Sequence, residues 1–298
     1  MANTAGINYD PAIAVAKATS ALLAMTAFDT ANARLSFNAP ASGKVLVRIR
    51  TTLSGATTFP SILLGVLNGA TIVGRKSPVG AISGSAVAST NVPQEIMFVV
   101  TGLSGAYNWD VAYAVQVLLG STNIHYGGPN NTTANDAWGG LIFEVWDATT
   151  LLAGKLYDPA AAVSKATTAA LAMTAIDTTN LRLTFTAPAS GNVLVRLGGV
   201  LHGATTFPQI LLGILDGATV RGRSQPLGGL KATALATAQL AVEACFLITG
   251  LTPSNSYTWD AAYGVETGIT STGLKYGGPD NASGNNAFGG FTFEIWPA

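Results

Sequence analysis

The chain contains one long sequence twice, and this duplication restricts its possible folds more than any other feature. The segment GATTFP at 55–60 recurs unchanged at 203–208, a shift of 148 residues. The segment YGGP at 126–129 recurs at 276–279, where the shift is 150 because the second copy gains two residues after Leu251. A repeat of this length is a domain rather than a solenoid unit. We therefore predict four segments: an N-terminal extension at 1–8, a first domain at 9–147, a short linker at 148–156 and a second domain at 157–298.

Each copy has the residue pattern of a β-sandwich. RLSF at 34–37 and VLVRIR at 45–50 alternate between apolar and polar side chains, which is typical of strands that bury one face. The apolar run at 61–67 ends in Asn68-Gly69, and the second copy has Asp216-Gly217 at this point; both dipeptides favour a tight hairpin turn. About eight strands in each copy predict an all-β chain of two tandem jelly-roll sandwiches.

The first and last segments of each copy differ in how clearly they predict a strand. Residues 12–27 are rich in Ala and contain Lys, Leu and Met, which favour a helix, but no helical stripe of apolar residues emerges. We expect a first strand there, with a short helix as the alternative. The closing segment 141–146 alternates strictly, which places Phe143 on one face and Glu144 and Trp146 on the other.

Composition excludes several kinds of protein. Charged residues make up 10% of the chain, whereas an average soluble domain has about 25%. The 15 basic and 15 acidic side chains cancel, so the sequence predicts no basic surface for nucleic acid. No run approaches the roughly 20 apolar residues of a spanning helix, and the first residues lack the basic region of a signal peptide. We expect no nucleic-acid partner and no membrane insertion. So few charges favour a surface covered by other proteins, or a neutral one rich in Thr, Ser and Gly.

Two motifs recur in both copies in the same order. An F-x-A-P-A-S-G segment leads into an alternating V-x-V strand at 37–47 and 185–195, and a closing segment reads AWGGL at 137–141 and AFGGF at 287–291. This order resembles the C1q/TNF-like jelly-roll family, although leucines stand where that family has aromatic residues after the glycine. The neutral composition and the tandem copies resemble tailed-bacteriophage virion proteins of the minor tail or decoration type. The resemblance implies a structural role in the virion and assembly as a homotrimer.

A nucleophilic triad requires a Ser or Cys, a His and an acid, and no such set recurs in the two copies. His125 aligns with a lysine of the second copy, and His202 aligns with a serine of the first. Cys245 lies in an apolar run, so we expect it in the core. Because phosphate-binding loops and zinc-binding motifs are also missing, we predict no cofactor and no metal, and we expect the chain not to be an enzyme.

Carboxylates are the only acid–base candidates that both copies share. Asp110 and Asp260 lie within Y-x-W-D-x-A-Y, and Glu144 and Glu294 lie in the last strands. Beside Trp109, Asp110 imitates the aromatic and acidic side chains of a glycosidase site. The alternative is a hairpin in which the Trp packs in the core and the Asp accepts hydrogen bonds from the backbone.

The Gly-rich loops at 126–140 and 276–290 are the best binding candidates. They read YGGPNNTTANDAWGG and YGGPDNASGNNAFGG, and their aromatic and amide side chains suit sugar recognition. Their oxygens also suit Ca²⁺, although each loop has only one carboxylate; a polar loop that caps the sandwich is the alternative. The candidate ligand-binding residues are Asn130, Asn131, Asp136, Trp138, Asp280, Asn281, Asn285 and Phe288. The candidate interface residues are Trp138, Trp146, Phe288 and Trp296.

These observations favour a virion structural protein, such as a minor tail or fibre-like component. We expect it to be made in the host cytoplasm and to assemble as a homotrimer with other virion proteins. One alternative is a capsid decoration or cement protein. Another is a carbohydrate-binding module that attaches the particle to a glycan of the host cell surface. A glycan hydrolase, which requires turnover by the shared carboxylates, is the remaining alternative.

Overall fold

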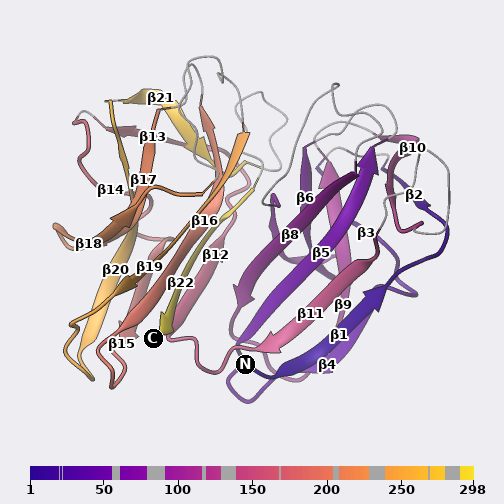
Figure 1. Cartoon of the computed structure of the whole chain (residues 1–298), viewed down its shortest axis with the longest axis horizontal. Helices are drawn as coiled ribbons and strands as arrows, with labels where there is room; N and C mark the ends of the chain where they lie inside the picture. Colours follow the sequence, from indigo (N-terminus) through magenta and orange to yellow (C-terminus); the bar gives the residue numbers. More distant parts are fainter. Residues whose placement is uncertain are drawn as a thin grey trace. The chain divides into compact units, whose positions relative to one another are not determined.

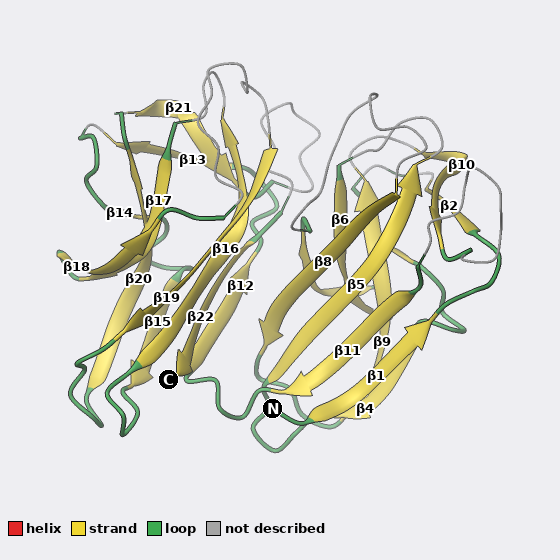
Figure 2. Ribbon diagram, in the orientation of Figure 1, coloured by secondary structure: helices red, strands yellow, loops and turns green. Residues whose placement is uncertain are grey.

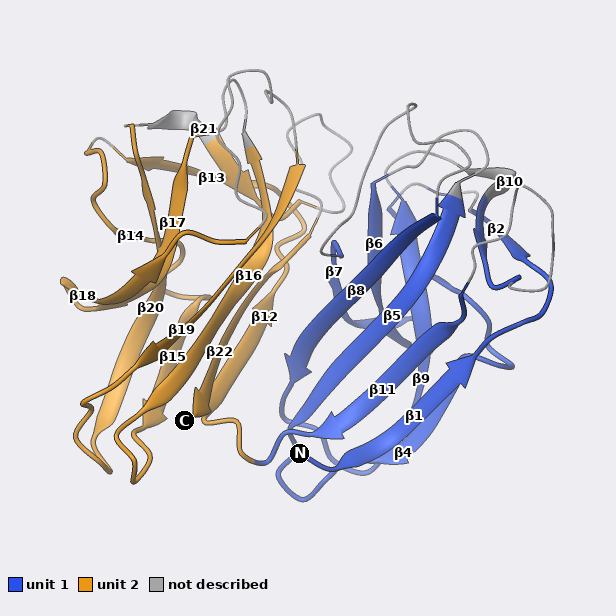
Figure 3. Ribbon diagram, in the orientation of Figure 1, with its two compact units in different colours: residues 1–149 blue, residues 150–298 orange. Residues whose placement is uncertain are grey.

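The fold is known from a computed structural model of the chain (Figure 1). The structure describes residues 1–19, 21, 23–55, 61–78, 91–115, 119–128, 139–167, 169–203, 208–227, 239–267, 269–278 and 289–298. Within these residues every regular element is a β-strand, so the predicted all-β fold is confirmed (Figure 2). None of the described residues belongs to a helix that is long and apolar enough to span a membrane. The chain divides into two compact units, Met1–Thr149 and Thr150–Ala298 (Figure 3).

Unit 1 is a sandwich of two antiparallel sheets (Figure 1). Its first sheet consists of β1 (Asn3–Tyr9), β2 (Val15–Thr19), β5 (Val45–Gly55), β8 (Asn91–Val100), β10 (Leu119–Tyr126) and β11 (Leu141–Asp147). Its second sheet consists of β3 (Thr26–Ala27), β4 (Arg34–Asn38), β6 (Ile62–Asn68), β7 (Thr71–Lys76) and β9 (Ala106–Val115). Among the described residues of the segment 12–27, the expected first strand is therefore present as β2 and β3, and the alternative short helix is not.

The central strand of the first sheet is β5. Strand β8 pairs with one edge of β5, while β11 and then β10 pair with its other edge. Strand β1 pairs with β11, and β2 pairs with β10, so the sheet has four strand positions, two of which hold an interrupted strand. In the second sheet, β3 and β4 both pair with β9, which is followed by β6 and β7. Two such layers of four positions form a jelly roll.

Unit 2 repeats this arrangement strand for strand. Its first sheet consists of β12 (Ala153–Tyr157), β13 (Val163–Thr167), β16 (Val193–Gly203), β19 (Gln239–Ile248), β21 (Ile269–Tyr276) and β22 (Phe291–Pro297). Its second sheet consists of β14 (Thr174–Ala175), β15 (Arg182–Thr186), β17 (Ile210–Asp216), β18 (Thr219–Ser224) and β20 (Ser256–Val265). The hairpins after β6 and β17 contain Gly69 and Gly217 with φ angles of 61° and 59°, as the Asn-Gly and Asp-Gly dipeptides predict.

The core of each unit lies between its two sheets and follows the predicted alternation. In β4 and β15 every second side chain is buried. Trp109 and Trp259 are fully buried at equivalent positions. Each meets the edge of a phenylalanine ring, Phe37 or Phe185, with ring centroids 4.8 and 4.7 Å apart. This edge-to-face geometry is the favoured one for aromatic pairs, so both cores are centred on the same packing.

Strand pairing extends both units beyond the predicted domain boundaries. Residues 3–8, predicted as an extension, belong to β1, which pairs with β11. Residues 153–156, predicted as part of the linker, belong to β12, which pairs with β22. None of the side chains in these two strands is fully buried; residues 5–9 of β1 alternate between half-buried and exposed, whereas β12 shows no alternation. Main-chain pairing holds both strands in the sheets, and in β12 Ala153 and Tyr157 also pack against the core.

Candidate functional site

Each first sheet carries a polar cluster on its outer face, which is the face turned away from the other sheet of the same unit. In unit 1 we name Arg48, Glu95, Glu144 and Trp146 the Arg–Trp cluster. Alternation along β8 and β11 buries the residues on either side of Glu95 and Glu144 more deeply than the glutamates themselves. Strand register then places Arg48 directly opposite Glu144 and diagonally opposite Glu95, within reach of both side chains.

The Arg48 guanidinium joins the two carboxylates of the cluster. Its Nε lies 3.1 Å from Glu95 Oε1 and its Nη2 lies 3.3 Å from Glu95 Oε2, which makes a two-point contact. Its Nη1 donates to Glu144 Oε2 at 3.4 Å, and Trp146 Nε1 donates to the same oxygen at 3.3 Å. Hydrogen bonding to Glu95 raises the pKa of the Arg48 guanidinium, although burial acts against it. The Arg48 guanidinium therefore stays charged, and the indole ring of Trp146 is held in place by its hydrogen bond.

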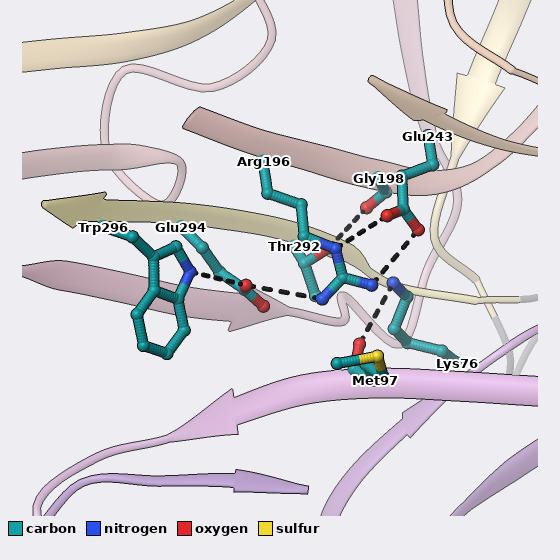
Figure 4. Close-up of polar contacts among 8 residues, drawn as sticks. All are labelled: Lys76, Met97, Arg196, Gly198, Glu243, Thr292, Glu294 and Trp296. Atoms are coloured by element: carbon teal, nitrogen blue, oxygen red, sulfur yellow. Dashed lines mark hydrogen bonds and ion pairs between the residues drawn. The ribbon is translucent and has the colours of Figure 1, made fainter. Parts of the chain in front are cut away.

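Unit 2 holds the same cluster in Arg196, Glu243, Glu294 and Trp296 (Figure 4). Arg196 donates to the two oxygens of Glu243 at 2.7 and 3.2 Å and to Glu294 at 3.4 Å. Trp296 Nε1 donates to Glu294 at 3.2 Å. Burial acts against the charge of the Arg196 guanidinium, but the two carboxylates outweigh it and raise its pKa. The two units therefore build one polar arrangement from the same four residue types.

In unit 1 the cluster borders a hollow of about 430 Å³. The hollow is lined by three members of the cluster and three apolar side chains: Arg48, Glu95, Trp146, Met1, Leu46 and Met97. The side chains of Arg48 and Glu95 are 33% and 37% exposed, so a ligand can reach both. Sites for small molecules typically measure about 300–1,000 Å³ and combine apolar walls with a few fixed polar groups. The hollow has this size and this composition.

Asp110 and Asp260 are committed to ion pairs on the second sheets. Arg34 approaches the two oxygens of Asp110 at 2.8 Å each, and Arg182 approaches those of Asp260 at 2.7 and 2.8 Å. Trp109 is fully buried, so it offers no exposed ring on which a sugar could stack. The structural interpretation of the Trp-Asp pair therefore holds, but the group that donates hydrogen bonds to the aspartate is an arginine and not the backbone. The glycosidase-like arrangement is not formed at Asp110.

A second recurrent polar group lies in each sandwich, and the sequence did not indicate it. In unit 1, Lys17 donates to the carbonyl of Phe28, and Asp29 accepts the backbone N–H groups of Ala31 and Asn32 at 2.9 Å each. Burial lowers the pKa of Lys17, and the charge of Asp29 opposes this shift. Unit 2 forms the same bonds with Lys165, Ile176, Asp177, Thr179 and Asn180. Because these bonds hold the turn that precedes β4 and β15, we assign the group to the fold.

The predicted loop residues lie outside the described residues. They are Asn130, Asn131, Asp136, Trp138, Asp280, Asn281, Asn285 and Phe288. Of the four predicted interface residues, Trp146 and Trp296 are described, and both belong to the clusters on the outer faces. Within the ranges that the structure describes, no three His, Cys, Asp or Glu side chains gather as metal ligands would.

The prediction that Cys245 lies in the core is wrong, because the thiol is exposed. Its neighbour Ala244 is buried, so the alternation of β19 turns Cys245 to the outer face, where it lies directly opposite Arg196. The run of apolar residues around it concealed this alternation.

Sequence reasoning named Glu144 and Glu294 but missed the arginines and the second glutamates of both clusters. Arg48 corresponds to Arg196 at the shift of 148, as Glu95 corresponds to Glu243, so the alignment of the two copies held the signal. A single Arg or Glu in an alternating strand looks like any solvent-facing residue. Only the strand register shows that these side chains meet.

Comparison with known proteins identifies no family. No family model and no curated protein matches the chain. Among solved structures, a peptide-N(4)-(N-acetyl-beta-D-glucosaminyl) asparagine amidase is similar with a TM-score of 0.45 and 10% identity, over 99% of this chain and 97% of that one. The tandem CBM51 modules of a family 98 glycoside hydrolase from Streptococcus pneumoniae show a TM-score of 0.20 and 9% identity, over 92% and 83%. The STIV MCP shows a TM-score of 0.26 and 11% identity, over 85% and 97%.

One of these comparisons corrects a prediction. The similar structures include an amidase, so the expectation that the chain is not an enzyme does not stand. That expectation rested on the absence of a nucleophilic triad and of metal-binding motifs, and only some kinds of enzyme use these features. At this TM-score and identity the likeness assigns no reaction to the present chain. Neither the resemblance to phage virion proteins nor the homotrimer is tested by these structures. What is shown is the architecture, an all-β chain of tandem sandwiches.

Proposed function

We propose that the protein binds glycans through the Arg–Trp cluster of unit 1, and that unit 2 carries a second cluster of the same kind. The observation that carries the proposal is the hollow beside this cluster, in which an indole, a guanidinium and a carboxylate face one space with apolar walls. The ligand we propose is a glycan of a host cell surface. The location we propose is a phage virion, as the resemblance to tailed-phage proteins implies.

The chemistry of a sugar matches this set of side chains. The C–H groups on the face of a sugar ring pack on an aromatic ring, and its hydroxyl groups exchange hydrogen bonds with carboxylate and guanidinium groups. Trp146 is held by its bond to Glu144, and Arg48 is held by its two-point contact with Glu95. Because these groups are already ordered, binding costs little side-chain entropy.

A glycan array probed with the full chain tests the proposal. Trp146→Ala should weaken binding about tenfold or more, since a buried aromatic anchor typically contributes about 2 kcal/mol. The loss of binding in Trp296→Ala measures how much the cluster of unit 2 contributes to glycan binding. Arg223→Gln is the control, because Arg223 is exposed on β18 and lies on the second sheet of unit 2. Thermal unfolding establishes that each variant is folded. The proposal would be contradicted if the wild-type chain bound none of the printed glycans, or if Trp146→Ala bound them as tightly as the wild type.

An assembly role is the second candidate, and two exposed leucines favour it. Leu194 and Leu247 face each other across β16 and β19, and they are 37% and 56% exposed. Trp296 lies beside Leu194 on the next strand, which extends the apolar surface. Such a surface gains free energy when a partner removes it from water. We propose that it contacts other copies of the chain in a homotrimer, either in a phage tail or as a capsid decoration protein.

Light scattering at micromolar concentration tests the assembly. The expected mass is three times the chain mass of 30.3 kDa. Leu247→Lys should shift the mass toward the monomer, because it places a charge in the contact. The exposed Val220→Lys on β18 is the control and should leave the mass unchanged. A wild-type monomer would contradict this second candidate and leave glycan binding open.

A further inference from the structure

The neighbours of the two Arg–Trp clusters differ at several positions, and one of these differences changes the charge. Arg50 lies two residues after Arg48 on β5, on the same outer face and about 7 Å further along the strand. Its cross-strand neighbours are Glu95 on β8 and Ile142 on β11. In unit 2 the corresponding residue is Gly198. A second arginine beside the cluster is therefore a feature of unit 1 alone.

Arg50 is exposed, and within the described ranges it takes part in no ion pair. The oxygens of its neighbour Glu95 already accept the hydrogen bonds of Arg48. A guanidinium stays charged at every physiological pH, and its planar donors match the oxygens of a carboxylate or a phosphate. Arg50 thus presents an uncommitted anion-binding group next to Glu95, which lines the hollow.

The charge of the two faces differs for the same reason. In unit 1, Arg48 and Arg50 together balance the carboxylates of Glu95 and Glu144, so the four groups sum to zero. In unit 2, Arg196 pairs with both Glu243 and Glu294, and the glycine at position 198 adds no charge beside them. An anionic ligand therefore meets an additional guanidinium at unit 1 that position 198 of unit 2 does not supply.

We propose that Arg50 makes unit 1 selective for glycans that carry an anionic group, either the carboxylate of a uronic acid or a phosphate. The sugar ring packs in the hollow beside Trp146, and its anionic group accepts a two-point hydrogen bond from Arg50. At unit 2 the corresponding residue is Gly198, which supplies no guanidinium for an anionic group. This inference rests on the proposed glycan binding and names the class of ligand for one of its two sites.

An array of matched pairs tests the selectivity. Each acidic oligosaccharide is printed beside its neutral form, which is the methyl ester of a uronic acid or the dephosphorylated sugar. The wild-type chain should bind the acidic member about tenfold more tightly or better, since a charge-assisted hydrogen bond is lost with the neutral one. Arg50→Gln should remove this preference, and Arg50→Lys should keep part of it. Added salt should weaken the acidic member selectively.

Gly198→Arg supplies the matched gain of function. Gly198 is buried, and a Cβ built on it lies 3.3 Å from the carbonyl oxygen of Val242, so the arginine side chain has to displace its neighbours. In a Trp146→Ala background, where binding by unit 1 is weakened, this substitution should create a preference for acidic sugars at unit 2. Thermal unfolding again establishes that the variant is folded.

The outcomes separate this inference from the proposed function. Equal binding of acidic and neutral members by the wild type overturns the selectivity and leaves glycan binding intact. An Arg50→Gln variant that loses both members equally also overturns it, because Arg50 then supports the site as a whole. A wild-type chain that binds no sugar contradicts the proposed function and this inference together. Preference within the uronic-acid pairs or within the phosphate pairs supports the inference and identifies which anion is recognised.

Discussion

Exchanging one core pair between the units tests how the two copies fill the same space. Unit 1 places Thr51 opposite Leu141, and unit 2 places Gly199 opposite Phe291. A Cβ built on Gly199 would lie 2.2 Å from Cδ2 of Phe291 and 2.9 Å from its Cγ and Cε2. Two non-bonded carbon atoms cannot lie 2.2 Å apart, so the ring of Phe291 occupies the space that a threonine side chain needs. Gly199→Thr alone must therefore displace the ring or the backbone.

A double-mutant cycle gives this competition a magnitude. Gly199→Thr overpacks a closed core, which typically costs about 1–3 kcal/mol, although replacing a glycine within a strand returns about 0.5–1 kcal/mol. Phe291→Leu removes part of a fully buried ring, and we expect a loss of about 1–2 kcal/mol, below the roughly 3–5 kcal/mol of a truncation to alanine. In the double variant the leucine makes room for the threonine. Its loss should be smaller than the sum of the single losses by about 1–3 kcal/mol.

Calorimetry of the full chain measures the cycle, because each unit can show its own transition. For a domain of this size, about 1 kcal/mol shifts the Tm by roughly 2–4 °C. Only the transition of unit 2 should move. The reciprocal exchange in unit 1, Thr51→Gly with Leu141→Phe, is the control and should show coupling of the same sign. Strictly additive losses in both units would refute the reasoning, because the ring and the threonine would then not compete.

Three polar or reactive groups give further expected outcomes. Asp110→Asn should lower the urea midpoint without changing the m-value, because Arg34 loses a nearly buried carboxylate; an unchanged midpoint would return Asp110 to the acid–base candidates. Burial acts against the charge of Asp177, but hydrogen bonds from Asn180 and the backbone outweigh it and lower its pKa. Its contribution to stability is therefore complete above the ordinary carboxyl pKa of about 3.9 and is lost as pH falls through the lowered value. The Tm difference between wild type and Asp177→Asn should accordingly persist at pH 5 and vanish only in strong acid; a difference already lost at pH 5 would contradict the assignment. Cys245 is exposed, so a disulfide reagent should modify the native chain; the rate should rise above neutral pH, because partial desolvation of the sulfur raises the pKa of the thiol and the thiolate is the reacting form. Reaction only after unfolding would contradict its placement.

The duplication and the alternating strands were enough to predict two tandem sandwiches, because a strand that buries one face must repeat with a period of two. The strands β1 and β12 were missed because none of their side chains is fully buried, so neither shows the strong apolar alternation of a core strand. The Arg–Trp cluster was missed for another reason. Arg48 and Glu95 are separated by 47 residues and meet only because β5 pairs with β8. No local pattern records such a contact, so the sequence alone could name members of the site but could not assemble them.

Stability alone accounts poorly for the two Arg–Trp clusters. Partly buried ion pairs add little net stability, since the loss of hydration offsets the attraction, and apolar replacements are often neutral or stabilising. Beside the clusters the copies have diverged, so that Met97 became Cys245 and Arg50 became Gly198, or the reverse. Trp109 illustrates a residue type that both copies keep for folding, because its buried ring fills the centre of a core. The cluster side chains lie outside both cores, yet both copies keep all four with the same hydrogen bonds, which agrees with the proposed glycan binding.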